Sequence, residues 1–152
     1  MKVAVTGASG LIGSALVPAL RARGHEVIRL VRRVPSAPDE VRWDPAAGTV
    51  DLAGLQGIDA VVHLAGAGVG DKRWTEAYKK EIRDSRVQGT TTIAQAMASL
   101  DPRPSVLVCG SAIGYYGDTG DREVTEKSPQ GAGFLADVSR KVHGQVETQG
   151  QG

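Results

Sequence analysis

The sequence predicts an α/β fold, in which helices connect the strands of a doubly wound parallel sheet. Short aliphatic runs recur along the chain, and segments with helical spacing separate them. The run over residues 60–64 is almost wholly apolar, a pattern typical of a strand that is covered on both faces. We expect the sheet to stop after about five strands, short of a complete doubly wound fold.

The apolar pattern and the residues that end it place each element. Strands are expected over residues 2–6, 27–31, 41–43, 60–64 and 105–109. Helices are expected over residues 14–23, 74–98 and 134–142. Leu16, Val17 and Leu20 give the first helix its spacing, and Gly24 stands where it would end. Thr75 or the nearby Asp71 can cap the second helix.

The composition is that of a globular protein and excludes several classes of partner. Hydrophobic residues make up 41% of the 152 residues, and charged residues make up 23%. A formal net charge of +1 offers no basic excess for nucleic acid or for an anionic membrane. The single cysteine fits a reducing cytoplasm, and no cluster of His, Cys and carboxylates has metal-ligand spacing. We therefore predict a cytoplasmic protein without a metal site or a membrane segment.

A glycine-rich loop follows the first strand and opens the first helix. Gly7, Gly10 and Gly13 are spaced three residues apart, as in loops that hold a dinucleotide. Gly7 allows the tight turn, Gly10 lets the backbone approach a pyrophosphate, and Gly13 lets the helix pack close to the strand. The N–H groups and the dipole at the start of the helix would hold the phosphates. The alternative is a loop that only turns the chain. We predict a Rossmann-like domain that binds a dinucleotide.

The end of the second strand indicates which dinucleotide. NAD-binding domains carry an acidic residue about 20 positions after the glycines, bonded to the ribose hydroxyls. Arg32 and Arg33 stand in this region, and no acid does. A guanidinium suits the additional phosphate of NADP. We predict NADP rather than NAD, with Arg32 as the nearer contact; the alternative is two solvated arginines at a strand end.

Four stretches of the sequence resemble a known superfamily. The glycine loop, together with residues 59–66, resembles the extended short-chain dehydrogenases/reductases. Residues 71–75 with Ser85 and Arg86, and residues 110–117, resemble an atypical subgroup labelled epimerase-family or cell-division-inhibitor-like proteins. This subgroup is related to the NAD-dependent epimerases/dehydratases. The resemblance runs from residue 1 to about 138, whereas a complete member is about twice as long and closes a C-terminal domain over its substrate.

The resemblance implies a set of cofactor contacts. It assigns the phosphates to Gly7, Gly10, Leu11, Ile12 and Gly13, and the adenosine end to Val31 and Arg32. Leu64 and Ala65 would line the crevice at the end of the fourth strand. Glu81 and Arg86 would face the same cleft from the helix that follows, or they form a surface pair on a charged helix.

The usual catalytic residues of the superfamily are missing or displaced. Its members use a tyrosine, a lysine four residues later, and a serine or threonine after the fifth strand. Leu135 and Ser139 stand at the first two positions, and Ala112 stands at the third, one residue after Ser111. Ser111 can polarise a carbonyl group, and Tyr115 or Tyr116 can supply a proton. The alternative is that Ser111 only ends a strand and the tyrosines pack over the cofactor site.

Two functional hypotheses follow. Residues 1–138 are predicted to form an incomplete NADP-binding domain, and residues 139–152 a polar, disordered tail. We expect that the natural reading frame or the gene model ends early, or that a fragment was made. The first hypothesis is an NADP-dependent oxidoreductase or epimerase acting on a sugar nucleotide or a similar hydroxylated substrate, with little catalysis by this form. The second is a dinucleotide-binding module without turnover, either a redox sensor or a partner-binding protein. The sequence leaves open whether the chain forms a homo-oligomer.

Overall fold

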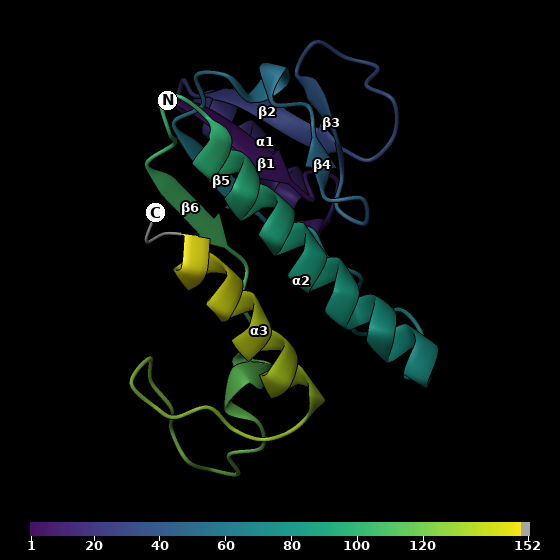
Figure 1. Cartoon of the computed structure of the whole chain (residues 1–152). Helices are drawn as coiled ribbons and strands as arrows, with labels where there is room; N and C mark the ends of the chain where they lie inside the picture. The colour runs from purple at the N-terminus through teal and green to yellow at the C-terminus, as the bar shows by residue number, and fades with distance from the viewer. Residues whose placement is uncertain (150–152) are drawn as a thin grey trace.

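The computed structural model describes residues 1–149, which form a twisted sheet with helices on both faces (Figure 1). The strands are β1 (Lys2–Thr6), β2 (Glu26–Val31), β3 (Glu40–Asp44), β4 (Thr49–Val50), β5 (Ala60–His63) and β6 (Val106–Cys109). Their order across the sheet is β4-β3-β2-β1-β5-β6, and every neighbouring pair except β3 and β4 is parallel. The helices are α1 (Leu11–Ala22), α2 (Glu76–Ser99) and α3 (Phe134–Gln149), with short 3-10 turns η1 (Ala53–Leu55) and η2 (Ile113–Tyr116). The predicted doubly wound α/β fold is confirmed.

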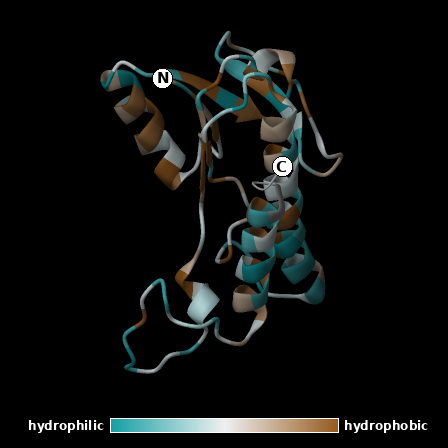
Figure 2. Cartoon of the chain, turned by 60° about the vertical axis from the view of Figure 1, so that its left-hand side comes forward, coloured by the Kyte–Doolittle hydropathy of each residue, from teal (hydrophilic) through white to brown (hydrophobic). Residues whose placement is uncertain are grey.

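Each face of the sheet has its own apolar core. Val3 and Val5 of β1 point to one face and pack with Val17 of α1. Ala4 points to the other face and joins a larger cluster that includes Ile93 of α2. This alternation is the two-residue period of a strand, with both faces covered by helices. Figure 2 shows the mostly hydrophobic α1 on one side of the sheet and the more hydrophilic pair α2 and α3 on the other.

The strand β4 is an addition to the predicted set. It is only two residues long, too short for a period to appear in the sequence, and it pairs antiparallel with β3. Trp43 lies opposite Val50 in this hairpin and is buried. The sheet therefore has six strands rather than about five.

The second helix begins where the sequence predicts a cap. The Thr75 hydroxyl accepts a hydrogen bond from the Tyr78 N–H at 3.2 Å, which confirms Thr75 as the capping residue. Tyr78 and Ile82 are buried, whereas Trp74 precedes the helix and is 41% exposed. The buried apolar stripe of α2 therefore starts at Tyr78, and the helix starts at Glu76 rather than at residue 74 as predicted.

The polar segment from residue 139 is helical, whereas the sequence predicts a disordered tail. It continues α3 as a helix to Gln149, and residues 150–152 lie outside the described residues. Val138 and Val142 are buried one turn apart on the face that packs against α2. Gln145 extends this contact through a 2.7 Å hydrogen bond with Thr91. Packing against a neighbouring helix, rather than composition, orders this segment.

One edge of the sheet carries exposed apolar side chains. Val106 and Val108 of β6 lie opposite Ala60 and Val62 of β5 in the parallel register, and they are 44% and 52% exposed. Exposed apolar side chains on an edge strand of this kind form a hydrophobic edge that is open to pairing. Among residues 1–149, no helix has both the length and the apolar character needed to cross a membrane.

A buried histidine joins the two central strands. His63 ends β5, and its Nδ1 lies 2.7 Å from the Thr6 hydroxyl at the end of β1. The same hydroxyl accepts hydrogen bonds from the N–H groups of Leu64 and Ala65, both at 3.1 Å. Because these two bonds use both lone pairs of the oxygen, Thr6 donates its own proton to Nδ1, and His63 is neutral. Burial lowers the pKa of His63 to about 4, which agrees with this assignment.

This histidine makes the stability of the fold pH-dependent. The folded chain takes up the His63 proton only near pH 4, whereas the unfolded chain takes it up near pH 6.5. The free energy of unfolding is therefore complete above pH 6.5 and falls as the pH drops towards 4. We expect His63 to account for a loss of about 2 kcal/mol between pH 7 and pH 4.5. Urea unfolding followed by circular dichroism across this range measures it.

The matched variant is His63→Asn, whose side-chain oxygen can still accept the Thr6 hydrogen bond but takes up no proton in this range. Its free energy of unfolding should depend on pH less steeply than that of the original chain, whatever its absolute value. Equal slopes for the two proteins would contradict the assignment.

Candidate functional site

A crevice crosses the carboxyl ends of the central strands. The chain leaves β1 in one direction towards β2, and β5 lies on the opposite side of β1. The loops that follow β1 and β5 therefore separate at this point, which is where open α/β sheets bind their ligands. The crevice consists of two hollows that share five residues, Gly7, Gly10, Leu64, Ala65 and Gly66.

Each residue predicted to contact a cofactor lines one of these hollows or both. The hollow towards β6, here called the β6 hollow, has a volume of about 330 Å³. It is lined by Gly7, Gly10, Leu11, Ile12, Gly13, Leu64, Ala65 and Arg86 from the predicted set. The hollow towards β2, here called the β2 hollow, has a volume of about 930 Å³. It is lined by Gly7, Gly10, Val31, Arg32, Leu64, Ala65 and Glu81 from that set.

The backbone of the glycine loop packs so closely that two of its glycines admit no side chain. Gly7 has φ +67°, and a Cβ atom there would lie 2.9 Å from the backbone nitrogen of Ala65. At Gly13, a Cβ atom would lie 2.2 Å from the carbonyl oxygen of Gly7. The first glycine therefore allows the turn and brings the loop against the end of β5, and the third docks the helix on the loop.

The first turn of α1 presents its N–H groups to the crevice. Among the described residues, no side chain caps this helix, and its first turn holds no acidic residue. The N–H groups of a first turn have no partner within their own helix, and the helix dipole adds positive charge there. Leu11 and Ile12 at this turn are 92% and 65% exposed. Such exposure is unusual for large apolar side chains on a helix that packs against a sheet. This arrangement suits an anion such as a pyrophosphate.

The loop after β5 is held against α2. The Ala67 N–H donates to the Ser85 hydroxyl at 3.0 Å, and Arg86 donates to the Ala67 carbonyl oxygen at 2.7 Å. Burial lowers the pKa of the Arg86 guanidinium. Glu81 is half-exposed and lies 3.9 Å from Lys72. Glu81 and Arg86 thus face different hollows and have different partners, rather than forming a surface pair with each other.

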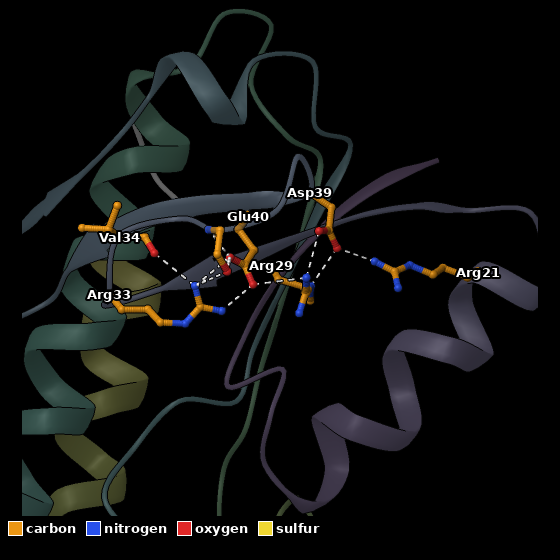
Figure 3. A network of polar contacts seen from close by, with 7 residues as sticks. Arg21, Arg29, Arg33, Val34, Asp39 and Glu40 are labelled. Atoms are coloured by element: carbon orange, nitrogen blue, oxygen red, sulfur yellow. Dashed lines mark hydrogen bonds and ion pairs between the residues drawn. The ribbon is translucent and has the colours of Figure 1, made fainter.

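A network of ion pairs fixes the segment between β2 and β3 (Figure 3). Arg33 donates two hydrogen bonds to the Glu40 carboxylate, at 2.8 and 2.6 Å. Arg29 donates two to Asp39, at 2.7 and 2.8 Å, and Arg21 adds a third contact at 2.5 Å. The bonds from Arg33 hold the pKa of the Glu40 carboxyl at about 2, and those from Arg29 hold that of Asp39 at about 2. Both carboxylates are therefore ionised at neutral pH, and the paired arginines balance their negative charges.

This network distinguishes the two arginines at the end of β2. Arg33 is engaged by Glu40, whose side chain is 2% exposed, and therefore does not stand as a free second guanidinium beside Arg32. Arg32 is exposed, lines the β2 hollow and has no ion-pair partner among residues 1–149. The hollow thus keeps one uncommitted guanidinium.

The residues predicted to be catalytic lie at the opposite end of the crevice. Ser111 follows β6 and lines the β6 hollow. Its Oγ lies 2.8 Å from Nε2 of His143 on α3. Tyr115, on η2, packs its ring against His143 with centroids 5.1 Å apart, and it is not among the residues that line either hollow. Sequence reasoning missed His143, which stands one helical turn after Ser139.

The positions of the missing tyrosine and lysine are occupied by groups that cannot replace them. Leu135 packs against Gly114 of η2, and Ser139 is buried with its side chain on the wall of the β6 hollow. Cys109 lines the same hollow rather than the interior of the sheet, and burial raises the pKa of its thiol. No ionisable group at these positions can lower the pKa of a tyrosine by charge.

The strand order, the glycine loop and the crevice define a Rossmann-like protein of the NAD(P)-binding type. The chain belongs to the NAD dependent epimerase/dehydratase family, whose model matches residues 3–133. An epimerase family protein of Mycobacterium bovis is 46% identical over 136 residues, which cover 90% of this chain and 44% of that protein. Human epimerase family protein SDR39U1 is 38% identical over 133 residues, covering 86% and 43%. The chain thus spans less than half the length of these relatives.

Solved structures show the same fold. A nucleoside-diphosphate sugar epimerase from Corynebacterium glutamicum matches with a TM-score of 0.84 and 38% identity, over 99% of this chain and 31% of that one. Human SDR39U1, solved with NADPH, also has a TM-score of 0.84, with 33% identity over 96% and 48%. MoeE5 in complex with UDP-glucose and NAD has a TM-score of 0.79 and 27% identity, over 98% and 49%.

The contact at Gly13 predicts a local loss of stability. In Gly13→Ala, the new methyl group meets the backbone of Gly7 and Ala8, which cannot move aside as a flexible side chain can. We expect α1 to be displaced and the free energy of unfolding to fall by about 1–3 kcal/mol, measured by urea unfolding.

The control is Gly144→Ala in α3, where an added methyl group meets nothing within 4 Å. This change should leave stability equal or raise it by up to about 1 kcal/mol, because alanine favours a helix. Equal stabilities of the two variants would show that the close approach at Gly13 is not required.

Proposed function

We propose that this chain is an NADP(H)-binding domain of an epimerase-family oxidoreductase. The observation that carries the proposal is the pairing, in one crevice, of an uncapped helix N-terminus with an uncommitted arginine. The first turn of α1 offers N–H groups to the pyrophosphate, and Arg32 offers a guanidinium to the phosphate on the adenosine ribose. Human SDR39U1, a relative solved with NADPH, supports the choice of dinucleotide.

The residues of the crevice fit this group. The glycine loop leaves no side chain between the backbone and a phosphate, and Gly7 and Gly13 are the positions where a Cβ atom would collide with backbone. In the proposed complex, Gly10 and the first turn of α1 hold the pyrophosphate. Val31 and Arg32 take the adenosine end, while Leu64 and Ala65 support the crevice between the two ends.

The local charge supports a phosphate at Arg32. Four guanidiniums, those of Arg21, Arg29, Arg32 and Arg33, stand near two carboxylates, those of Asp39 and Glu40. Each carboxylate is paired, so the region carries excess positive charge despite its acids. An acid that remained free at this point would repel the additional phosphate and favour NAD.

We propose that the whole protein acts on a sugar nucleotide or a similar hydroxylated substrate. Relatives described as a nucleoside-diphosphate sugar epimerase and as a complex with UDP-glucose and NAD support this class. A bound nicotinamide cofactor would supply or accept hydride. Ser111 would hold the substrate oxygen and Tyr115 would supply a proton, both from the β6 side of the crevice.

A second candidate is a dinucleotide-binding module without turnover. The observation that favours it is the pair Leu135 and Ser139, which replaces the tyrosine and lysine with groups unable to act as an acid–base pair. On this hypothesis the chain would sense the dinucleotide or bind a partner. Binding with no exchange of hydride in a full-length relative carrying the same residues would favour it.

The test of the cofactor assignment is calorimetric titration with NADPH and NADH, with circular dichroism confirming the fold. The original chain should bind NADPH more tightly. Arg32→Ala should weaken NADPH binding by roughly tenfold or more, because a charge-assisted hydrogen bond is lost, and should leave NADH binding nearly unchanged.

The matched control is Arg23→Ala, which removes an exposed guanidinium at the other end of α1. It should leave both affinities unchanged. Equal losses for NADPH and NADH in Arg32→Ala would refute the phosphate contact, and absence of binding by the folded chain would refute the proposed function.

A further inference from the structure

A serine and a histidine from distant parts of the chain meet at the β6 end of the crevice. Ser111 follows β6, and His143 lies 32 residues later on α3, yet Oγ and Nε2 are 2.8 Å apart. Ser111 is part of the wall of the β6 hollow, so its hydroxyl connects the imidazole to the crevice. The Ser111–His143 contact is a hydrogen bond between a nucleophilic hydroxyl and a base. It lies in the region where the superfamily carries out proton transfer.

The histidine ring is held in place by its neighbours. The Tyr115 ring lies over it at 33°, and Tyr116 packs edge-on against Tyr115 with centroids 5.2 Å apart. Two residues further along α3, Gln145 accepts a hydrogen bond from Thr91 of α2. The imidazole is therefore positioned by η2 on one side and by the contact between α2 and α3 on the other.

We infer that Ser111 and His143 form a proton-transfer pair, in which the Ser111 hydroxyl donates to His143 and takes up the proton of a substrate hydroxyl. The inference rests on the proposed function and adds to it a base that neither the family pattern nor the sequence assigns. The pair takes over the proton transfer given to Tyr115 in the proposed function, and Tyr115 instead holds the imidazole by its ring contact.

The proton and the electrons balance in this step. During oxidation of a substrate alcohol, the carbinol C–H bond breaks and hydride passes to the oxidised nicotinamide cofactor. The substrate O–H proton moves to Ser111 Oγ as the original Ser111 proton moves to His143 Nε2. The products are a carbonyl compound, the reduced cofactor and an imidazolium, and reduction runs the same transfers in reverse.

Ionisable side chains lie on the elements around the imidazole and the hollow. Arg140 and Glu147 lie on its own helix at spacings of three and four residues, and Tyr115 is the ionisable group that touches the ring. Arg86 of α2 faces the same hollow as Ser111. None of these groups is a hydrogen-bonded carboxylate of the kind that would replace Ser111 as the partner of Nε2.

The first test is the tautomer of the neutral His143 ring, measured by nitrogen NMR on the whole chain at a pH where the ring is neutral. Donation by Ser111 requires a bare Nε2, so the proton must reside on Nδ1. Ser111→Ala should shift the ring to the Nε2–H tautomer that a free imidazole prefers, while Ser111→Thr, which keeps the hydroxyl, should retain the Nδ1–H tautomer. The chain has three histidines, which makes assignment by single substitution direct.

The second test places the pair relative to the cofactor. NADP⁺ should move the His143 ring signals, whereas the same dinucleotide without its nicotinamide ring should bind and leave them unmoved. His25 is the internal reference, because it precedes β2 at the opposite end of the strands from the crevice. Its signals should move with neither ligand.

The outcomes separate this inference from the proposed function. Binding of NADP⁺ with unmoved His143 signals would overturn the proton-transfer pair and leave dinucleotide binding intact. An Nε2–H tautomer in the original chain would overturn the pair as well, because His143 would then donate to Ser111. Absence of binding by either ligand would overturn both.

Discussion

The hydroxyl of Thr6 joins the two central strands at the point where the crevice begins. Its oxygen accepts the N–H groups of Leu64 and Ala65 and its proton goes to His63, so one buried side chain fixes the end of β5 against the end of β1. The approach is close enough that Gly7 has no room for a Cβ atom beside Ala65. The glycine loop, the start of α1 and the floor of both hollows take their positions from this contact, and it holds only while His63 is neutral.

At the other side of the crevice, the acidic residues between β2 and β3 are paired with arginines, so they leave no free negative charge to repel an anion. The connection from β2 to β3 contains no helix, and a buried carboxylate organises it instead: Glu40 receives Arg33 and the N–H of Ser36. Burying an ionised carboxylate is costly unless it is paired and hydrogen-bonded. The pairing engages the Arg33 guanidinium, although the Arg33 side chain stays 56% exposed. Arg32 is left as the uncommitted guanidinium, and on the proposed function this arginine would select NADP over NAD by binding the additional phosphate.

Sequence reasoning succeeded where the signal is local and failed where it depends on tertiary contact. The glycine spacing lies within seven residues, and the order strand, loop, helix around it could be predicted from the printed chain. The engagement of Arg33 by Glu40 could not, since nothing in the local pattern tells a paired arginine from a free one. The helix beyond Ser139 had a signal in Val138, Val142 and Val146, which are four residues apart. Gly144 and the polar residues of this segment predicted disorder instead, because the sequence does not show that α2 offers a surface to pack against. His143 was missed for the same reason, because its partner is 32 residues away.

The two ends of the crevice differ in how they are built, and this bears on what the chain can do alone. The phosphate end is made by backbone atoms of a short contiguous loop and by one strand end, all fixed by hydrogen bonds within the central sheet. The Ser111 end is made by side chains from the segment after β6, from η2 and from α3, which come together through the packing of α3 against α2 and η2. Beside it, Val106 and Val108 lie exposed on β6, the edge strand that precedes Ser111. Loss of packing at α3 would therefore separate His143 from Ser111 while leaving the glycine loop in place. The proposed dinucleotide binding and the proposed proton transfer thus depend on different parts of the fold.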